Sequence, residues 1–131
     1  MPQKPWTRFG SPNANENFVA LVSYLPLKSV WHVFPFMVYT AQIIGQLKAA
    51  QGLLGYSLLA HPFEGKFWTL SAWKDDEALR RFVQDPPHVR IMSALSTHMK
   101  PTKFVRWTVK GGSLPLRWDE AQSRLRDLSQ K

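Results

Sequence analysis

Residues 67–73 (FWTLSAW) contain no glycine, proline or charge and are followed almost at once by a helix start signal. A run of this length that is rich in Trp and Phe favours a β-strand. Asp75 is a good helix N-cap, and Asp76 and Glu77 place negative charge in the first turn, where backbone N–H groups are unpaired. The sequence therefore predicts a strand that leads directly into a helix over residues 76–84.

The apolar spacing in the rest of the chain predicts further strands and helices around this pair. The strands are residues 18–25, 55–61 and 103–109, and the helices are residues 35–50, 87–98 and 118–128. The order strand, helix, strand, strand, helix, strand is that of a ferredoxin-like βαββαβ sandwich, an α+β fold with one antiparallel sheet. We predict an irregular arm over residues 1–17, this domain over residues 18–110, and a linker with an extra C-terminal helix over residues 111–131.

The first strand has apolar side chains on both of its faces. One face carries Phe18, Ala20, Val22 and Tyr24, and the other carries Val19, Leu21, Ser23 and Leu25. A sheet with one solvated face alternates between apolar and polar residues, and this strand does not. Since the predicted helices cover only one face, we expect the same sheet of another copy to cover the second, giving a homodimer.

Composition narrows the classes of function. The chain has 131 residues and no cysteine, which excludes disulfides, thiolate metal sites and cysteine nucleophiles. No signal peptide or membrane-spanning segment is visible, so we expect a cytoplasmic protein without a membrane span. The net charge is +8, but the basic residues are scattered and accompany no nucleic-acid-binding motif, so we do not expect nucleic acid as a partner. An aromatic content of 13% is high for a small chain and favours an aromatic pocket or an interface.

The 67–73 run, the helix beginning Asp76-Glu77-Ala78-Leu79 with Phe82, and the following Pro87-His88 and Met92 form one pattern. This pattern resembles the dimeric α/β-barrel superfamily that includes the antibiotic biosynthesis monooxygenases, with its spheroidene-monooxygenase-like and uncharacterised branches. The resemblance extends over residues 18–109. It implies a ferredoxin-like subunit that pairs into a dimeric α/β barrel.

The resemblance implies several activities rather than one. Members of the superfamily include cofactor-free quinone-forming oxygenases, haem-degrading enzymes, haem dehydratases, isomerases and proteins without known activity. The haem-degrading branch has an Asn in its first strand, and a helical Trp followed ten positions later by a His. This chain has no Asn in that strand, and it has Phe82 and Met92 at the other two positions. The sequence therefore departs from the haem-degrading pattern.

His88 is the candidate catalytic residue. Pro87 restricts the backbone just before it, and the side chain shares a helical face with Met92. An imidazole there can act as a general base, donate a hydrogen bond to substrate, or ligate a haem iron. The alternative is a half-buried histidine that hydrogen-bonds a backbone carbonyl. His32, His61 and His98 are dispersed, so no metal site is predicted.

Five residues are candidates for binding a substrate: Trp68, Trp73, Phe82, Met92 and Arg106. The two tryptophans lie on opposite faces of their strand, and plain packing is the alternative for each. Arg106 can anchor an anionic or phenolic ligand or form a salt bridge with a carboxylate. We predict a monooxygenase-like protein with a hydrophobic aromatic, phenolic or polyene substrate and no cofactor. The alternatives are a non-enzymatic ligand-binding or interaction domain and a haem-binding protein.

Overall fold

The computed structural model describes residues 3–10 and 12–129 of the chain. Every strand and helix predicted between residues 18 and 128 is present. The elements are β1 (Gln3–Arg8), β2 (Asn17–Pro26), α1 (Val33–Ala49), β3 (Leu53–His61), β4 (Lys66–Trp73), α2 (Asp76–Gln84), α3 (His88–Leu95), β5 (Lys103–Lys110) and α4 (Trp118–Ser129). Short 3₁₀ turns lie between them: η1 (Val30–His32), η2 (Pro62–Glu64), η3 (Ser96–His98) and η4 (Gly111–Ser113).

The strands form one antiparallel sheet in the order β1-β3-β4-β2-β5. Without β1 this is the strand arrangement of a ferredoxin-like βαββαβ fold, as predicted. β4 lies at the centre of the sheet and pairs with β3 and β2 along its length. Its central position explains why its sequence carries no charge after Lys66, because both of its faces are covered.

The helix start signal after β4 works as predicted. The Asp75 carboxylate accepts a hydrogen bond from the backbone N–H of Ala78, with an N–O distance of 2.8 Å. This bond satisfies one of the unpaired donors in the first turn of α2. The side chains of Ala78, Leu79 and Phe82 are then buried against the sheet.

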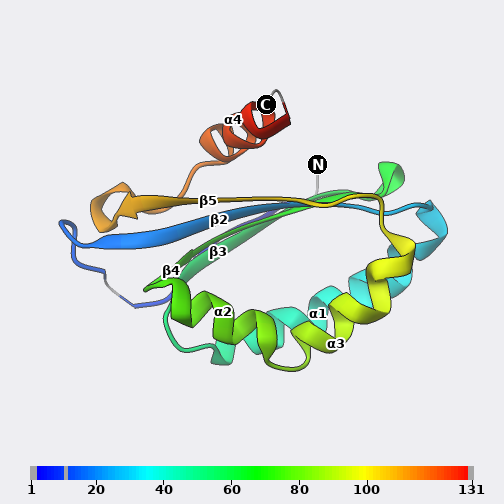
Figure 1. The fold of residues 1–131 in the computed structure, drawn as a ribbon, viewed down its shortest axis with the longest axis horizontal. Coiled ribbons are helices and arrows are strands. Elements are labelled where there is room, and N and C mark those ends of the chain that lie inside the picture. The colour runs from blue at the N-terminus through cyan, green and yellow to red at the C-terminus, as the bar shows by residue number, and fades with distance from the viewer. Residues whose placement is uncertain (1–2, 11, 130–131) are drawn as a thin grey trace.

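The sheet has helices on both faces (Figure 1). Helices α1, α2 and α3 cover one face, which we call the helical face, and α4 lies on the other. On the α4 side, Leu116, Ala121 and Leu125 pack against four sheet residues: Ala20, Val22, Leu70 and Ala72. The Trp118 indole N–H also donates to the Ser57 hydroxyl at 3.0 Å.

The position of α4 weakens the reason given above for expecting a homodimer. We expected the chain's own helices to reach only one face of the sheet. The chain instead crosses back through Gly111–Ser113 and lays α4 over part of the second face. The apolar residues there are therefore covered in part within the same chain, and their pattern does not by itself require a partner copy.

The prediction of an irregular N-terminal arm is wrong for residues 3–8, which form β1. This strand pairs with β3, and its register shifts between Lys4 and Thr7. The sequence hid it because Pro5 and the register shift interrupt the regular alternation, and proline is tolerated on an edge strand. The rest of the predicted arm includes residues 1–2 and 11, which lie outside the described residues, as do residues 130–131 of the C-terminal segment.

Candidate functional site

A large apolar cavity lies between the helical face of the sheet and helices α1, α2 and α3. Its volume is about 1080 Å³, enough for a ligand of several rings. Aliphatic and aromatic side chains make up most of its wall, and Met37, Val83 and Phe104 on that wall are also exposed to solvent. The cavity is therefore an apolar site that communicates with the outside.

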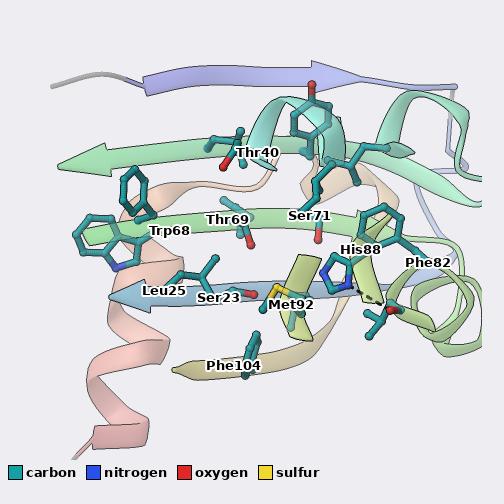
Figure 2. Close-up of a pocket in the computed structure, with 18 of the residues that line it drawn as sticks. Ser23, Leu25, Thr40, Trp68, Thr69, Ser71, Phe82, His88, Met92 and Phe104 are labelled. Carbon is teal, nitrogen blue, oxygen red and sulfur yellow. Dashed lines mark hydrogen bonds between the residues drawn. The ribbon is translucent and has the colours of Figure 1, made fainter. Parts of the chain in front are cut away.

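The floor of the cavity carries a short row of hydroxyl groups. Ser23 on β2 pairs in register with Thr69 on β4, and Ser71 lies two residues further on the same face. Figure 2 shows these three side chains together with His88 and Phe82. The Ser71 hydroxyl accepts a hydrogen bond from the Trp73 indole N–H at 2.9 Å. This row is not among the predicted site residues, although alternation along β4 already placed Thr69 and Ser71 on one face.

His88 begins α3 and lines the cavity. Its Nδ1 lies 3.2 Å from the backbone oxygen of Val83, and its ring centre is 5.0 Å from that of Phe82. A carbonyl oxygen can only accept, so Nδ1 carries the proton in this bond. The neutral ring then has an unprotonated Nε2, and Figure 2 shows that nitrogen on the cavity side of the ring. The imidazole is thus fixed as the tautomer that a general base requires.

Burial lowers the pKa of His88 below its usual value of 6.5, and the hydrogen bond from the ring to Val83 opposes the shift more weakly. The side chain is therefore held largely neutral at pH 7. A lowered pKa has a consequence for stability: as pH falls below 6.5, the unfolded chain takes up a proton at this position before the folded chain does.

We therefore expect the free energy of unfolding to decrease as pH falls from about 6.5 to the lower folded-state pKa of His88. A His88→Gln variant should lose this part of the slope, because glutamine does not titrate. Urea unfolding of both proteins at several pH values between 4.5 and 8 measures the difference. Equal slopes for the two proteins would show that His88 is not buried as described.

Gln46 on α1 holds the turn that carries His88. Its side-chain oxygen accepts from the backbone N–H of His88 at 2.9 Å. Its side-chain nitrogen donates to the backbone oxygens of Phe82 at 3.0 Å and Asp85 at 3.3 Å. One side chain thus ties the end of α2 and the start of α3 to α1. Sequence reasoning did not find this residue, because a glutamine within an amphipathic helix is normally solvated.

Replacing Gln46 with leucine is expected to lower the free energy of unfolding by about 2 kcal/mol, because it removes three hydrogen bonds and leaves partly buried backbone groups unpaired. Gln42→Leu is the matched control, because Gln42 is exposed one turn earlier on the same helix. Urea midpoints of the two variants measure the effect. A Gln46→Leu protein as stable as the control would contradict this role.

The structure brings four of the predicted site residues together. His88, Phe82, Met92 and Trp73 all line the cavity. The Phe82 ring contacts the rings of both His88 and Trp73, and its centre is 5.2 Å from that of Trp73. Figure 2 shows Met92 close to His88. Because Trp73 is 1% exposed, it contributes mainly to the packing beneath the cavity.

Trp68 lies apart from this group. It borders the cavity, but its ring packs on the α4 side of the sheet, with the rings of Tyr24 at 5.4 Å and His61 at 4.8 Å. Trp68 and Trp73 do lie on opposite faces, as the sequence predicts. Arg106 also borders the cavity, and its guanidinium forms an exposed salt bridge with Asp76 at 3.1 Å. The salt bridge was one of the two alternatives for this residue.

The part of the chain that the structure describes has no candidate metal centre and no candidate membrane-spanning helix. Among the described residues, no three His, Asp or Glu side chains lie close enough to hold a metal ion. Within the same residues, no helix is both long and apolar enough to cross a membrane.

Several solved structures share this fold. The oxygenase SnoaB from Streptomyces nogalater, described as cofactor-independent, superposes with a TM-score of 0.61 at 18% identity, covering 77% of this chain and 100% of its own. A putative antibiotic biosynthesis monooxygenase from Nitrosomonas europaea gives a TM-score of 0.64 at 17% identity, covering 76% of this chain and 94% of its own. PA3566 from Pseudomonas aeruginosa gives a TM-score of 0.62 at 17% identity, covering 70% of this chain and 93% of its own. The chain therefore has the fold of the antibiotic biosynthesis monooxygenase-like proteins.

The family follows from the sequence. Residues 42–131 match the model of the family described as Domain of unknown function (DUF3291), and the chain belongs to this family. Curated protein sequences gave no match to the chain. The matched region begins inside α1 and includes β3, β4, α2, α3, β5 and α4. It therefore contains His88 as well as the C-terminal helix.

Proposed function

We propose that this protein is a small oxygenase that acts on a planar, hydrophobic aromatic or polyene substrate in the cavity beside His88. The observation that carries the proposal is the state of His88: a neutral imidazole, fixed at Nδ1 by the Val83 carbonyl, in a cavity with an otherwise mainly apolar wall. The fold of solved oxygenases supports the class of reaction. Fold alone does not assign the substrate.

For a phenolic substrate such as an anthrone, the proposed reaction begins with proton transfer to Nε2 of His88. The resulting carbanion gives one electron to O₂, and the two radicals combine to form a peroxide on the same carbon. His88 returns its proton to this peroxide anion, which restores the neutral imidazole. Loss of water from the resulting hydroperoxide leaves a carbonyl, so the CH₂ group and O₂ become C=O and H₂O. The substrate supplies all the electrons, and no cofactor is needed.

Other residues that line the cavity have separate roles in this proposal. Phe82 and Met92 offer flat and polarizable surface to an aromatic ring. The hydroxyl groups of Ser23 and Thr69 can hydrogen-bond the oxygen of a phenol or quinone. Arg106, at the cavity wall, would hold an anionic substituent in exchange for part of its contact with Asp76. The apolar wall keeps bulk water from the carbanion and the peroxide.

Oxygen uptake by the purified protein with anthrone tests the function. We expect uptake that depends on protein and substrate, with one O₂ consumed for each quinone formed. A ligand-binding domain without catalytic activity is the alternative. It would quench tryptophan fluorescence on adding the anthrone but consume no oxygen above the background rate, and that result would overturn the oxygenase proposal.

Haem is a second candidate ligand, because the residues present fit it. Nε2 of His88 would hold the iron, and Arg80 and Arg106 on the cavity wall would pair with the propionates. Bound haem would supply an iron that reacts with oxygen. Titration with haemin tests this: a Soret band that is lost in His88→Ala and kept in His98→Ala supports haem binding. An identical spectrum for both variants excludes His88 as the ligand.

We also propose that two copies associate. Three aromatic residues on the α4 side are only partly buried, namely Tyr24, Trp68 and Trp107, so apolar surface is left for a second subunit. Sedimentation velocity at micromolar concentration is expected to give a species of twice the chain mass, 30 kDa for a chain of 15.1 kDa. A monomer under these conditions contradicts the expectation. If the protein is such a monomer, Trp68→Glu should leave its sedimentation coefficient unchanged.

A further inference from the structure

Three large aromatic side chains project into solvent at one end of the molecule. Trp31 on η1 is 87% exposed, Phe34 in the first turn of α1 is 79% exposed, and Phe63 on η2 is 96% exposed. The turns η1 and η2 contact each other, and Trp31 and Phe34 are three positions apart at the start of a helix. The three rings therefore belong to one surface, which we call the aromatic tip. It lies at the right-hand end of the sheet in Figure 1.

The backbone beneath the aromatic tip is well anchored, so the exposed rings are not on loose loops. The rings of His32 and His98 pack against each other in a tilted arrangement, with their centres 4.1 Å apart, and join η1 to η3. The backbone of Leu27 donates to Gly65 at 2.7 Å, and that of Lys28 donates to His98 at 2.8 Å. This ring contact and the two hydrogen bonds hold the turns in place, while Trp31 and Phe63 stay exposed. Exposed apolar surface held in this way usually marks a site of interaction.

The same end of the molecule is basic. The segments that meet there are residues 24–36, 60–67 and 96–104, and they contain four lysines and one acidic residue. The lysines are Lys28, Lys66, Lys100 and Lys103. The acidic residue, Glu64, already pairs with His61 at 2.9 Å and Lys66 at 4.0 Å. The other acidic residues of the chain belong to other segments, so this end carries a local positive charge.

From this combination we infer that the aromatic tip binds the surface of an anionic lipid membrane, with its rings in the headgroup region and its lysines on the lipid phosphates. Trp and Phe are the side chains that favour the boundary between headgroups and acyl chains. Basic residues beside them add attraction to anionic lipids. The attachment is peripheral and does not require that the protein be an oxygenase.

A membrane fits this surface better than the two other partners considered. Single-stranded nucleic acid stacks on aromatic rings that line a basic groove, whereas these rings stand on two projecting turns. A second protein copy would bring one group of lysines against an identical group, because a two-fold interface repeats the same patch. A negatively charged lipid surface meets both the charge and the apolar rings.

The cavity and the aromatic tip are connected through α1. Phe34 precedes Phe36 and Met37 in the first turns of this helix, and these two residues line the cavity. A ligand dissolved in the membrane would thus meet the protein at the end where α1 begins. Water-insoluble ring compounds and polyenes collect in membranes, so an attached protein would sample them at a higher local concentration.

Co-sedimentation with vesicles tests the inference. We expect the protein to bind phosphatidylcholine vesicles containing phosphatidylglycerol, and to bind weakly or not at all to phosphatidylcholine alone. Phe63→Ser should weaken binding about tenfold, because it removes a ring that is buried in the headgroup region when the protein is bound. Lys28→Gln and Lys100→Gln should each weaken it about fivefold. The matched controls are Leu128→Ser on α4 and Lys48→Gln at the far end of α1, and both should bind as the unchanged protein does.

A second readout places Trp31 in the membrane. Brominated lipids quench tryptophan, so they should quench part of the fluorescence of the unchanged protein, and Trp31→Phe should remove that part while binding persists. Equal binding by Phe63→Ser and the Leu128→Ser control would overturn the inference. So would a self-associated species that Phe63→Ser converts to monomer, or an oligonucleotide that displaces the protein from vesicles. None of these outcomes depends on catalysis.

Discussion

His88→Ala is expected to lower the rate of oxygen uptake with anthrone by roughly 10²–10⁴-fold, the usual contribution of a positioned general base. The structure gives the reason: the neutral ring presents Nε2 to the cavity while the Val83 carbonyl holds Nδ1. The dependence of kcat/KM on pH should also differ between the variant and the unchanged protein. For the unchanged protein, kcat/KM should rise as pH passes through the lowered pKa of His88 and then level off.

His98→Ala is the matched control, because His98 packs against His32 and does not line the cavity. It should keep the rate of the unchanged protein. His88→Gln separates chemistry from folding, since its amide can replace the hydrogen bond to Val83 but cannot take up a proton. If His88→Gln turned over at the full rate, proton transfer to His88 would not be the catalytic step.

Trp73→Ala is expected to lower the free energy of unfolding by about 3–5 kcal/mol, the largest stability loss predicted for this chain. The Trp73 side chain is 1% exposed, donates to the Ser71 hydroxyl and packs on Phe82. Its removal leaves a void beneath the cavity and an unpaired hydroxyl, and a core this small has little capacity to close around it. Urea unfolding followed by circular dichroism measures the loss.

Trp31→Ala is the matched control for Trp73→Ala. The same side chain is removed, but Trp31 is 87% exposed, so the free energy of unfolding should change by no more than about 0.5 kcal/mol. Equal losses in the two variants would mean that Trp31 is buried in solution. In that case a partner, such as a second copy, would have to cover the aromatic tip.

Local sequence signals were sufficient for most of the elements. The uncharged run at residues 67–73 and the Asp75 cap determine where β4 ends and α2 begins, because a strand and a capped helix require nothing beyond their own residues. The alternation along β4 also placed Trp68 and Trp73 on opposite faces. The same reasoning singled out His88, since a histidine after a proline at a helix start has a restricted direction.

The sequence by itself thus determined the order of strands and helices from residue 18 onward, the ferredoxin-like class and the position of His88 in the chain. The tertiary structure alone decided three things: that β1 adds to β3, that α4 covers the second face, and that Gln46 holds His88. The physical reason is the distance along the sequence over which each interaction acts. Caps and periodicity act over a few neighbouring residues, whereas Gln46 and His88 are 42 positions apart and meet only when α1 and α3 pack together.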